Sequence, residues 1–194
     1  RVGVGLMASP DLSVAIGSLK LPNPLIAASG CFGYGLEYEQ VVDLSLLGGV
    51  VSKGLFMNER QGHPPPRIVE TPAGMINAIG LQGIGVHRFV KEKLPLLRQR
   101  GARTFVNVCG TTLDEYVEVC KVLSQAEGVA AIELNISCPN IKEGGIQFGC
   151  SLNGTFDVVS AVRKATTLPV IPKLTPNVTD VASFAKAAED AGAD

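Results

Sequence analysis

The stretch TFVNVCGTTLDEYVEVCKVLSQAEGVAAIELN, residues 104–135, contains the pattern that decides the fold. It begins and ends with short runs rich in apolar and β-branched residues, TFVN at 104–107 and AAIELN at 130–135. Between these runs, apolar residues recur at the i, i+3, i+4, i+7 spacing of an amphipathic helix: Leu113, Tyr116, Val117 and Cys120. Thr112 and Glu115 supply a capping box at the start of that helix. The stretch therefore predicts a strand, a helix and a second strand.

The same alternation extends in both directions along the chain. Further strands are predicted at Leu25–Ala28, Gly49–Ser52 and Val170–Leu174. Further helical spacing occurs at residues 158–165 and 181–188, and a helix is predicted from Val86 to Arg100, kinked or restarted at Pro95. The hydrophobicity of the strands is continuous rather than alternating, which is typical of parallel strands buried on both faces.

Two architectures fit five strand–helix units in this order, a doubly wound sheet and a (β/α)₈ TIM barrel. Such a barrel takes about 250 residues, and this chain has 194. We expect residues 1–194 to be a single domain, the N-terminal part of a barrel without its last three strands. A small hairpin, Leu12–Leu21, precedes the first strand and turns near Gly17 and Ser18. The long connection Gly54–Gly85 is too rich in apolar residues to be a linker.

Composition excludes several classes of protein. The 17 Lys and Arg residues balance 18 Asp and Glu residues to a net charge of −1, which disfavours nucleic-acid or anionic-membrane binding. No apolar run approaches the roughly 20 residues of a membrane-spanning helix, and the N-terminus does not resemble a signal peptide. The five cysteines form no C-x-x-C pair, so we expect free thiols, a cytoplasmic location and no metal site.

Polar residues stand at the carboxyl ends of the predicted strands, where barrel enzymes place their active sites. They are Ser29, Gly30, Lys53, Asn107, Asn135 with Ser137 and Cys138, and Lys173. A lysine beside a buried strand requires an anion or an acidic partner, or must reach solvent with its ammonium group. Glu133 is the one acid near these strand ends, and its i, i+2 relation to Asn135 can point it the same way. The set suits a polar, planar, partly anionic ligand.

Residues 136–152, ISCPNIKEGGIQFGCSL, form a glycine-rich loop after one of these strand ends, and we expect it to move as a lid. Cys138 lies at its start, between two asparagines. A cysteine there can act as a base or a nucleophile, whereas Cys31, Cys109, Cys120 and Cys150 are expected to be inert packing residues.

Five motifs resemble those of one enzyme family: ASGCFG at 28–33, VSKG at 51–54, INAIGLQ at 76–82, NISCPNIKEGG at 135–145 and VIPKLTPN at 170–177. Together they resemble dihydroorotate dehydrogenase, most closely the catalytic subunit of the class 1, NAD-linked B type. The resemblance runs from about Leu12 onward. It implies a flavin mononucleotide (FMN) barrel enzyme that oxidises dihydroorotate to orotate in pyrimidine (UMP) biosynthesis.

The resemblance also implies roles for individual residues. Cys138 matches the catalytic base, and Lys53 lies where the family brings substrate and flavin together. The substrate-binding positions match Lys53, Asn77, Ala78, Ile79, Gly80, Leu81, Asn135 and Asn140. The FMN-binding positions match Ser29, Gly30, Lys53, Gly54, Asn107, Asn135 and Lys173. The sequence departs from the family at Gly83, commonly asparagine, and at Cys109, more often alanine or serine.

B-type relatives imply a homodimer of catalytic subunits joined to an electron-transfer subunit that holds FAD and a [2Fe-2S] cluster and passes electrons to NAD⁺. Other readings stay open from the residues alone. One is another FMN-dependent pyrimidine reductase or dehydrogenase. A second is a Schiff-base aldolase using Lys173, and a third is a binding barrel without flavin.

Overall fold

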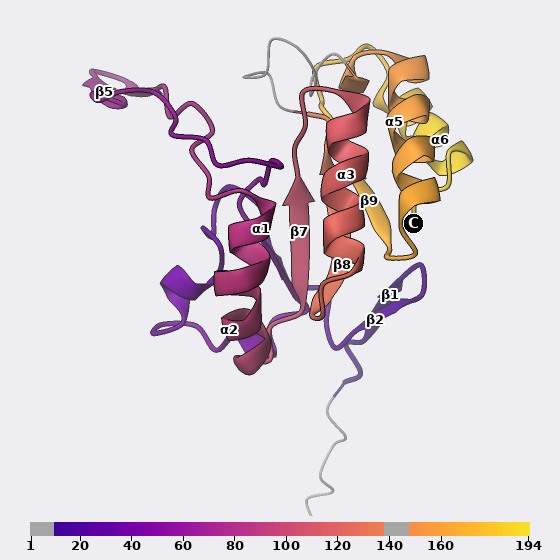
Figure 1. Ribbon diagram of the computed structural model, residues 1–194, viewed down its shortest axis with the longest axis horizontal. Helices are drawn as coiled ribbons and strands as arrows, with labels where there is room; N and C mark the ends of the chain where they lie inside the picture. The colour runs from indigo at the N-terminus through magenta and orange to yellow at the C-terminus, as the bar shows by residue number, and fades with distance from the viewer. Residues whose placement is uncertain (1–9, 138–147) are drawn as a thin grey trace, which may run out of the picture.

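Five parallel strands form the central sheet of the computed structural model, which describes residues 10–137 and 148–194 (Figure 1). The strands are β3 (Ile26–Ala27), β4 (Gly49–Val51), β7 (Thr104–Val108), β8 (Val129–Asn135) and β9 (Val170–Lys173). Each pairs in parallel with the next, and their order in the sheet is their order in the chain. A doubly wound sheet reverses its strand order partway, and this sheet does not. The architecture is therefore a half-barrel, as predicted for a truncated (β/α)₈ barrel.

Helices cover one face of the sheet, with α3 (Leu113–Ser124) and α5 (Leu152–Ala165) lying in front of it in Figure 1 and α6 (Val181–Asp190) beside α5. Alternate strand residues point to this face: Val50, Val106 and Ile132 belong to the large cluster that also contains Tyr116 and Val158. No helix in the two described ranges is long and apolar enough to cross a bilayer.

The intervening strand residues form a second cluster on the inner face of the half-barrel. Val51, Phe105 and Ala131 pack there with Leu21. Leu21 comes from the predicted N-terminal hairpin, which is present as β1 (Val14–Ile16) and β2 (Leu19–Leu21), with a turn at Gly17 (φ +53°). Burial on both faces explains why the strand hydrophobicity is continuous rather than alternating.

The predicted helix at 86–100 is present in three consecutive parts: α1 (Val86–Arg88), a π-helical turn η3 (Phe89–Lys93) and α2 (Leu94–Gln99). Pro95 lies in the first turn of α2, where its missing N–H is not needed. The predicted restart at Pro95 is therefore confirmed, because α2 begins at Leu94 after the π turn.

Thr112 caps α3 as predicted, since its Oγ1 accepts a hydrogen bond from the Glu115 backbone N–H at 3.2 Å. The returning bond differs from that of a capping box. The Glu115 carboxylate accepts from the backbone N–H and the hydroxyl of Thr111, each at 2.8 Å, and thereby holds the residue before the cap.

The connection at 54–85 contains a hairpin that the sequence analysis did not predict, β5 (Ile68–Thr71) and β6 (Gly74–Asn77). All of its residues are exposed, and Figure 1 shows it projecting away from the sheet. Two short 3₁₀ helices, η1 (Leu36–Tyr38) and η2 (Leu44–Leu46), complete the described elements.

Candidate functional site

Parallel pairing brings the polar strand ends to one edge of the sheet. Asn107 lies opposite Glu133 in the pairing of β7 with β8, and Asn135 lies opposite Lys173 in the pairing of β8 with β9. Ser29 follows the carboxyl end of β3. The expected convergence of strand ends is thus confirmed in the geometry.

Glu133 is the centre of this cluster. Its Oε1 accepts a hydrogen bond from Ser29 Oγ at 2.6 Å and another from Asn107 Nδ2 at 2.5 Å. Lys173 Nζ donates to Ser29 Oγ at 3.2 Å and so reaches the carboxylate through that hydroxyl. Glu133 is therefore the acidic partner expected for a strand-end lysine, and the Ser29 hydroxyl connects it to Lys173.

A second group of bonds continues from Asn107. Its Oδ1 accepts from Asn135 Nδ2 at 3.2 Å and from the Cys109 thiol at 3.5 Å. Asn135 Oδ1 in turn accepts from the hydroxyl of Ser137 at 3.1 Å and from its backbone N–H at 3.3 Å. The Asn135 carbonyl is held separately by the Tyr116 hydroxyl at 2.7 Å. Four strands thus contribute to one polar network.

Lys53 and Gly54 follow β4, which lies between β3 and β7. The Lys53 backbone N–H donates to the Gly33 carbonyl at 2.7 Å. A Cβ at Gly54 would lie 2.7 Å from Cys109 Sγ and 2.9 Å from Asn107 Oδ1, so the network packs directly against this glycine. At Gly30 (φ +82°) no atom lies within 4 Å of where a Cβ would be, which leaves open space beside Ser29.

The predicted substrate segment 77–81 begins at the last residue of β6. Asn77 is exposed at the end of β6, paired with Ile68, and Ala78 donates its backbone N–H to the Arg67 carbonyl. Ile79 accepts from the His63 N–H, and a Cβ at Gly80 would clash with His63. Leu81 packs against Phe56 and against Cys109, which belongs to the network.

Arg67 holds the base of this projecting segment together. Its guanidinium donates to the carbonyls of Gln61 and His63 and to the side chain of Gln82. Asn77 is the last residue of this exposed hairpin and Ala78 follows it. The hydrogen bonds of Arg67 hold the segment where it leaves the rest of the protein.

Two predicted residues, Cys138 and Asn140, lie outside the described residues, as does most of the predicted lid. Ser137 is the last residue described before that loop, and its two bonds to Asn135 tie the start of the loop to the network. Among the described residues no group of three His, Cys, Asp or Glu side chains could hold a metal ion.

Ser137 was predicted among the strand-end residues, and Glu133 was predicted as the acid near the lysines without a binding role. The participation of Cys109 in the network was not predicted. Cys109 is buried and packs with Phe56 and Leu81, as expected, and its thiol also contacts Asn107 and Asn135. The prediction that Cys31 and Cys150 are packing residues is wrong, because both are exposed in loops outside the core.

Comparison with known proteins gives one family. The family model described as dihydroorotate dehydrogenase matches residues 11–194. The proteins named "Dihydroorotate dehydrogenase B (NAD(+)), catalytic subunit" from Citrifermentans bemidjiense and Thermoanaerobacter pseudethanolicus are 52% and 48% identical over 188 and 184 residues. These alignments cover 97% and 95% of this chain but 62% and 61% of the relatives, so the chain spans under two thirds of their length.

A solved structure supports the fold. The crystal structure of DHODH in complex with ferulenol from Eimeria tenella superposes with a TM-score of 0.74 and 20% identity, covering 96% of this chain and 58% of that one.

Proposed function

This chain belongs to the dihydroorotate dehydrogenase family, and from that premise we propose that it oxidises dihydroorotate to orotate in pyrimidine biosynthesis, as the catalytic subunit of a B-type, NAD-linked enzyme. The observation that carries this proposal is the network joining Ser29, Asn107, Asn135 and Lys173 around Glu133 at the carboxyl edge of the sheet. Barrel enzymes place their chemistry at that edge.

The residues present fit FMN. The network offers amide, hydroxyl and ammonium groups to a planar polar ring, the open space at Gly30 leaves room for it, and Gly54 presents backbone where a side chain would clash. Ser29, Gly30, Lys53, Gly54, Asn107, Asn135 and Lys173 would hold it. Bound FMN supplies a hydride acceptor for C6 of dihydroorotate.

The chain's own groups do the remaining work. Cys138 takes the proton from C5 of dihydroorotate as a general base. The ammonium groups of Lys53 and Lys173 stabilise negative charge that gathers on the ring system during the reaction. Asparagine side chains present both a donor and an acceptor, which suits the imide and carboxylate edges of the substrate. In the proposed site, substrate is held by Lys53, Asn77, Ala78, Ile79, Gly80, Leu81, Asn135 and Asn140.

The names of the relatives support the rest of the assignment, since they are called catalytic subunits of NAD(+) enzymes. We assign electron transfer to NAD⁺ to a partner subunit that carries FAD and a [2Fe-2S] cluster, joined to a homodimer of this subunit. We also propose a cytoplasmic location, where thiols such as those of the exposed Cys31 and Cys150 stay reduced.

The test is anaerobic mixing of the FMN-loaded protein with dihydroorotate. We expect the flavin absorbance near 450 nm to bleach rapidly and orotate to appear in equal amount. Bleaching by an uncarboxylated dihydropyrimidine but not by dihydroorotate would identify a different pyrimidine oxidoreductase. Borohydride trapping of a carbonyl substrate on Lys173, without flavin binding, would identify an aldolase instead.

Replacing the proposed base separates the chemistry from cofactor binding. We expect Cys138→Ser to retain FMN and to slow flavin reduction by dihydroorotate by about two to four orders of magnitude, the usual contribution of a general base. Rapid-mixing absorbance measures the rate. Cys150→Ser, an exposed cysteine outside the strand-end network, is the matched control and should bleach at the wild-type rate.

A further inference from the structure

The hydrogen bonds at the strand ends run in one direction. Ser137 donates to Asn135 Oδ1, Asn135 Nδ2 donates to Asn107 Oδ1, and Asn107 Nδ2 donates to Glu133 Oε1. Each asparagine uses its carbonyl on one side and its NH₂ on the other. The chain therefore begins at the residue next to Cys138 and ends on a carboxylate.

The carboxylate explains this direction. An asparagine side chain can be turned over, which exchanges its donor for its acceptor at almost no change in shape. An ionised carboxylate only accepts, so the group beside it must donate. Asn107 is 1% exposed, so a misplaced amide there would be buried with its donor or acceptor unsatisfied, which costs free energy. The Asn107 NH₂ must therefore face Glu133, and its carbonyl must face Asn135. For the same reason the Asn135 NH₂ faces Asn107, and the Asn135 carbonyl faces Ser137.

A branch from the same oxygen reaches the cation. Ser29 gives its proton to Glu133 Oε1 at 2.6 Å, so its lone pairs face Lys173 Nζ at 3.2 Å. Lys173 is otherwise exposed, and a free ammonium on a long side chain would sample many positions. The carboxylate thus directs two asparagine amides and one ammonium.

We propose that Glu133 is a positioning residue of the flavin site, whose carboxylate sets the donor-to-acceptor direction of the Ser137–Asn135–Asn107 chain and holds Lys173 through Ser29. It acts on the cofactor through these groups, so that Asn135, Asn107 and Lys173 meet the flavin already oriented. The effect of Glu133 on flavin binding rests on the proposed function. Its effect on the orientation of the asparagine side chains does not.

Two substitutions separate orientation from charge. Glu133→Leu removes the acceptor and leaves the Asn107 NH₂ unpaired in a buried place, so we expect the dissociation constant for FMN to rise at least about tenfold. Glu133→Gln keeps a carbonyl oxygen that can accept both bonds without charge assistance. We expect it to bind FMN about fivefold more weakly than the wild type and more tightly than the leucine variant. Quenching of FMN fluorescence measures both constants.

A second readout does not depend on flavin. In the apoprotein labelled with ¹⁵N-asparagine, we expect Glu133→Leu to shift the side-chain NH₂ resonances of Asn107 and of Asn135, and Glu133→Gln to shift mainly that of Asn107. The resonances are assigned by their loss in Asn107→Ser and Asn135→Ser. Glu127→Gln is the control, because this exposed carboxylate precedes β8 and pairs only with Arg98 at 2.7 Å among the described contacts.

The outcomes distinguish the two proposals. If the wild-type protein binds no FMN, the proposed function is wrong, and the Asn135 resonance alone still decides the role of Glu133. If the wild type binds FMN while Glu133→Gln binds it equally well, or if Glu133→Leu leaves the Asn135 resonance in place, Glu133 does not position the site. If Glu133→Leu does not fold, the FMN affinity of Glu133→Gln compared with that of the wild type decides whether Glu133 positions the site.

Discussion

At the scale of single residues, the surroundings of a cysteine determine its chemistry. Cys120 points into the apolar core between α3 and the sheet, and burial raises the pKa of its thiol to about 12. Cys109 is equally hidden from solvent but contacts the asparagine network. Cys31 and Cys150 face solvent. Since only the thiolate is nucleophilic, the four thiols should differ in reactivity.

We predict that iodoacetamide at pH 8 alkylates Cys31 and Cys150 within minutes and leaves Cys120 unmodified until the protein unfolds. The raised pKa of Cys120 and its burial both suppress its thiolate, and raising the pH to 9 should not expose it. Peptide mass spectrometry of the alkylated protein measures each site. Modification of Cys120 at the rate of Cys31 would contradict the packing of α3 described above.

The residue roles that sequence can predict are those that depend on position along a strand. Ser29, Asn107, Asn135 and Lys173 stand at strand ends, and parallel pairing alone brings them together. The proposed role of Glu133 could not be predicted from the sequence, because it depends on hydrogen bonds donated by Ser29 and Asn107, which are distant from it in the chain. Asn77 is a different case: the family motif assigns it to the substrate, this stays a prediction, and the structure places it at the end of an exposed hairpin strand.

At the scale of elements, helices were predicted best because their apolar spacing and their caps are local. The caps at Thr112 and Asp180 act within their own helices. The ends of the five sheet strands differ from the predicted ends by at most one residue. The β5–β6 hairpin was missed because none of its residues is buried, so no hydrophobic pattern marks it. Only the Pro72–Ala73–Gly74 turn between two β-branched runs signalled it.

The cap of α6 gives a pH prediction. Hydrogen bonds from the Ser183 hydroxyl and then from the Ala182 N–H lower the pKa of Asp180 below its ordinary value of 3.8. A lowered pKa in the folded state means that this stabilisation is complete above pH 3.8 and is lost as the pH falls through the folded-state value.

We therefore expect the difference in unfolding midpoint between wild type and Asp180→Ala to be constant from pH 5 to 7 and to shrink below pH 3.8. Urea unfolding followed by circular dichroism at each pH measures it. Asp157→Ala, an exposed aspartate within α5, is the control and should show no such loss. A difference that grows on acidification would mean that Asp180 does not cap the helix as a carboxylate.

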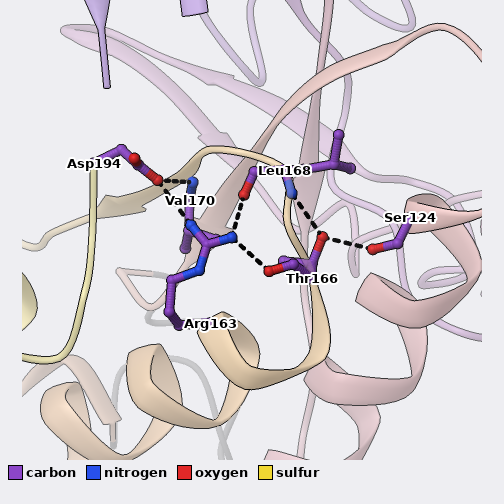
Figure 2. A network of polar contacts seen from close by, with 6 residues as sticks. All are labelled: Ser124, Arg163, Thr166, Leu168, Val170 and Asp194. Carbon is purple, nitrogen blue, oxygen red and sulfur yellow. Dashed lines mark hydrogen bonds and ion pairs between the residues drawn. The ribbon is translucent and has the colours of Figure 1, made fainter. Parts of the chain in front are cut away.

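At the scale of the whole molecule, the order of the strands in the sheet is predictable from the sequence. The joints, meaning the hydrogen bonds that connect one strand–helix unit to the next, are not. Figure 2 shows one such joint at the amino end of β9. The Arg163 guanidinium donates to the carbonyls of Thr166 and Leu168 and to Asp194 Oδ2, which also accepts from the Val170 N–H. Thr166 is tied to Ser124 of α3 at 2.6 Å. The joint links α3, α5, β9 and Asp194, which lies four residues beyond the end of α6.

Arg163→Lys should weaken this joint although it keeps the positive charge. The planar guanidinium of arginine spreads its N–H donors over three acceptors, and the compact ammonium of lysine cannot reach all three. We expect a loss of about 1–3 kcal/mol in the free energy of unfolding, since the partly buried carbonyls of Thr166 and Leu168 lose a donor. Chemical unfolding measures it, with the exposed neighbour variant Lys164→Ala as control. Equal stability of Arg163→Lys and wild type would show that charge alone holds the joint.

The account rests on one claim, that the strand-end side chains together hold a flavin. The most direct measurement is the dissociation constant for FMN of Lys173→Ala beside that of Lys164→Ala, which removes an exposed lysine from α5. The account predicts at least about tenfold weaker FMN binding for Lys173→Ala, as expected for losing a charged hydrogen-bond donor, and wild-type binding for the control. Equal FMN affinity in the two variants would contradict it.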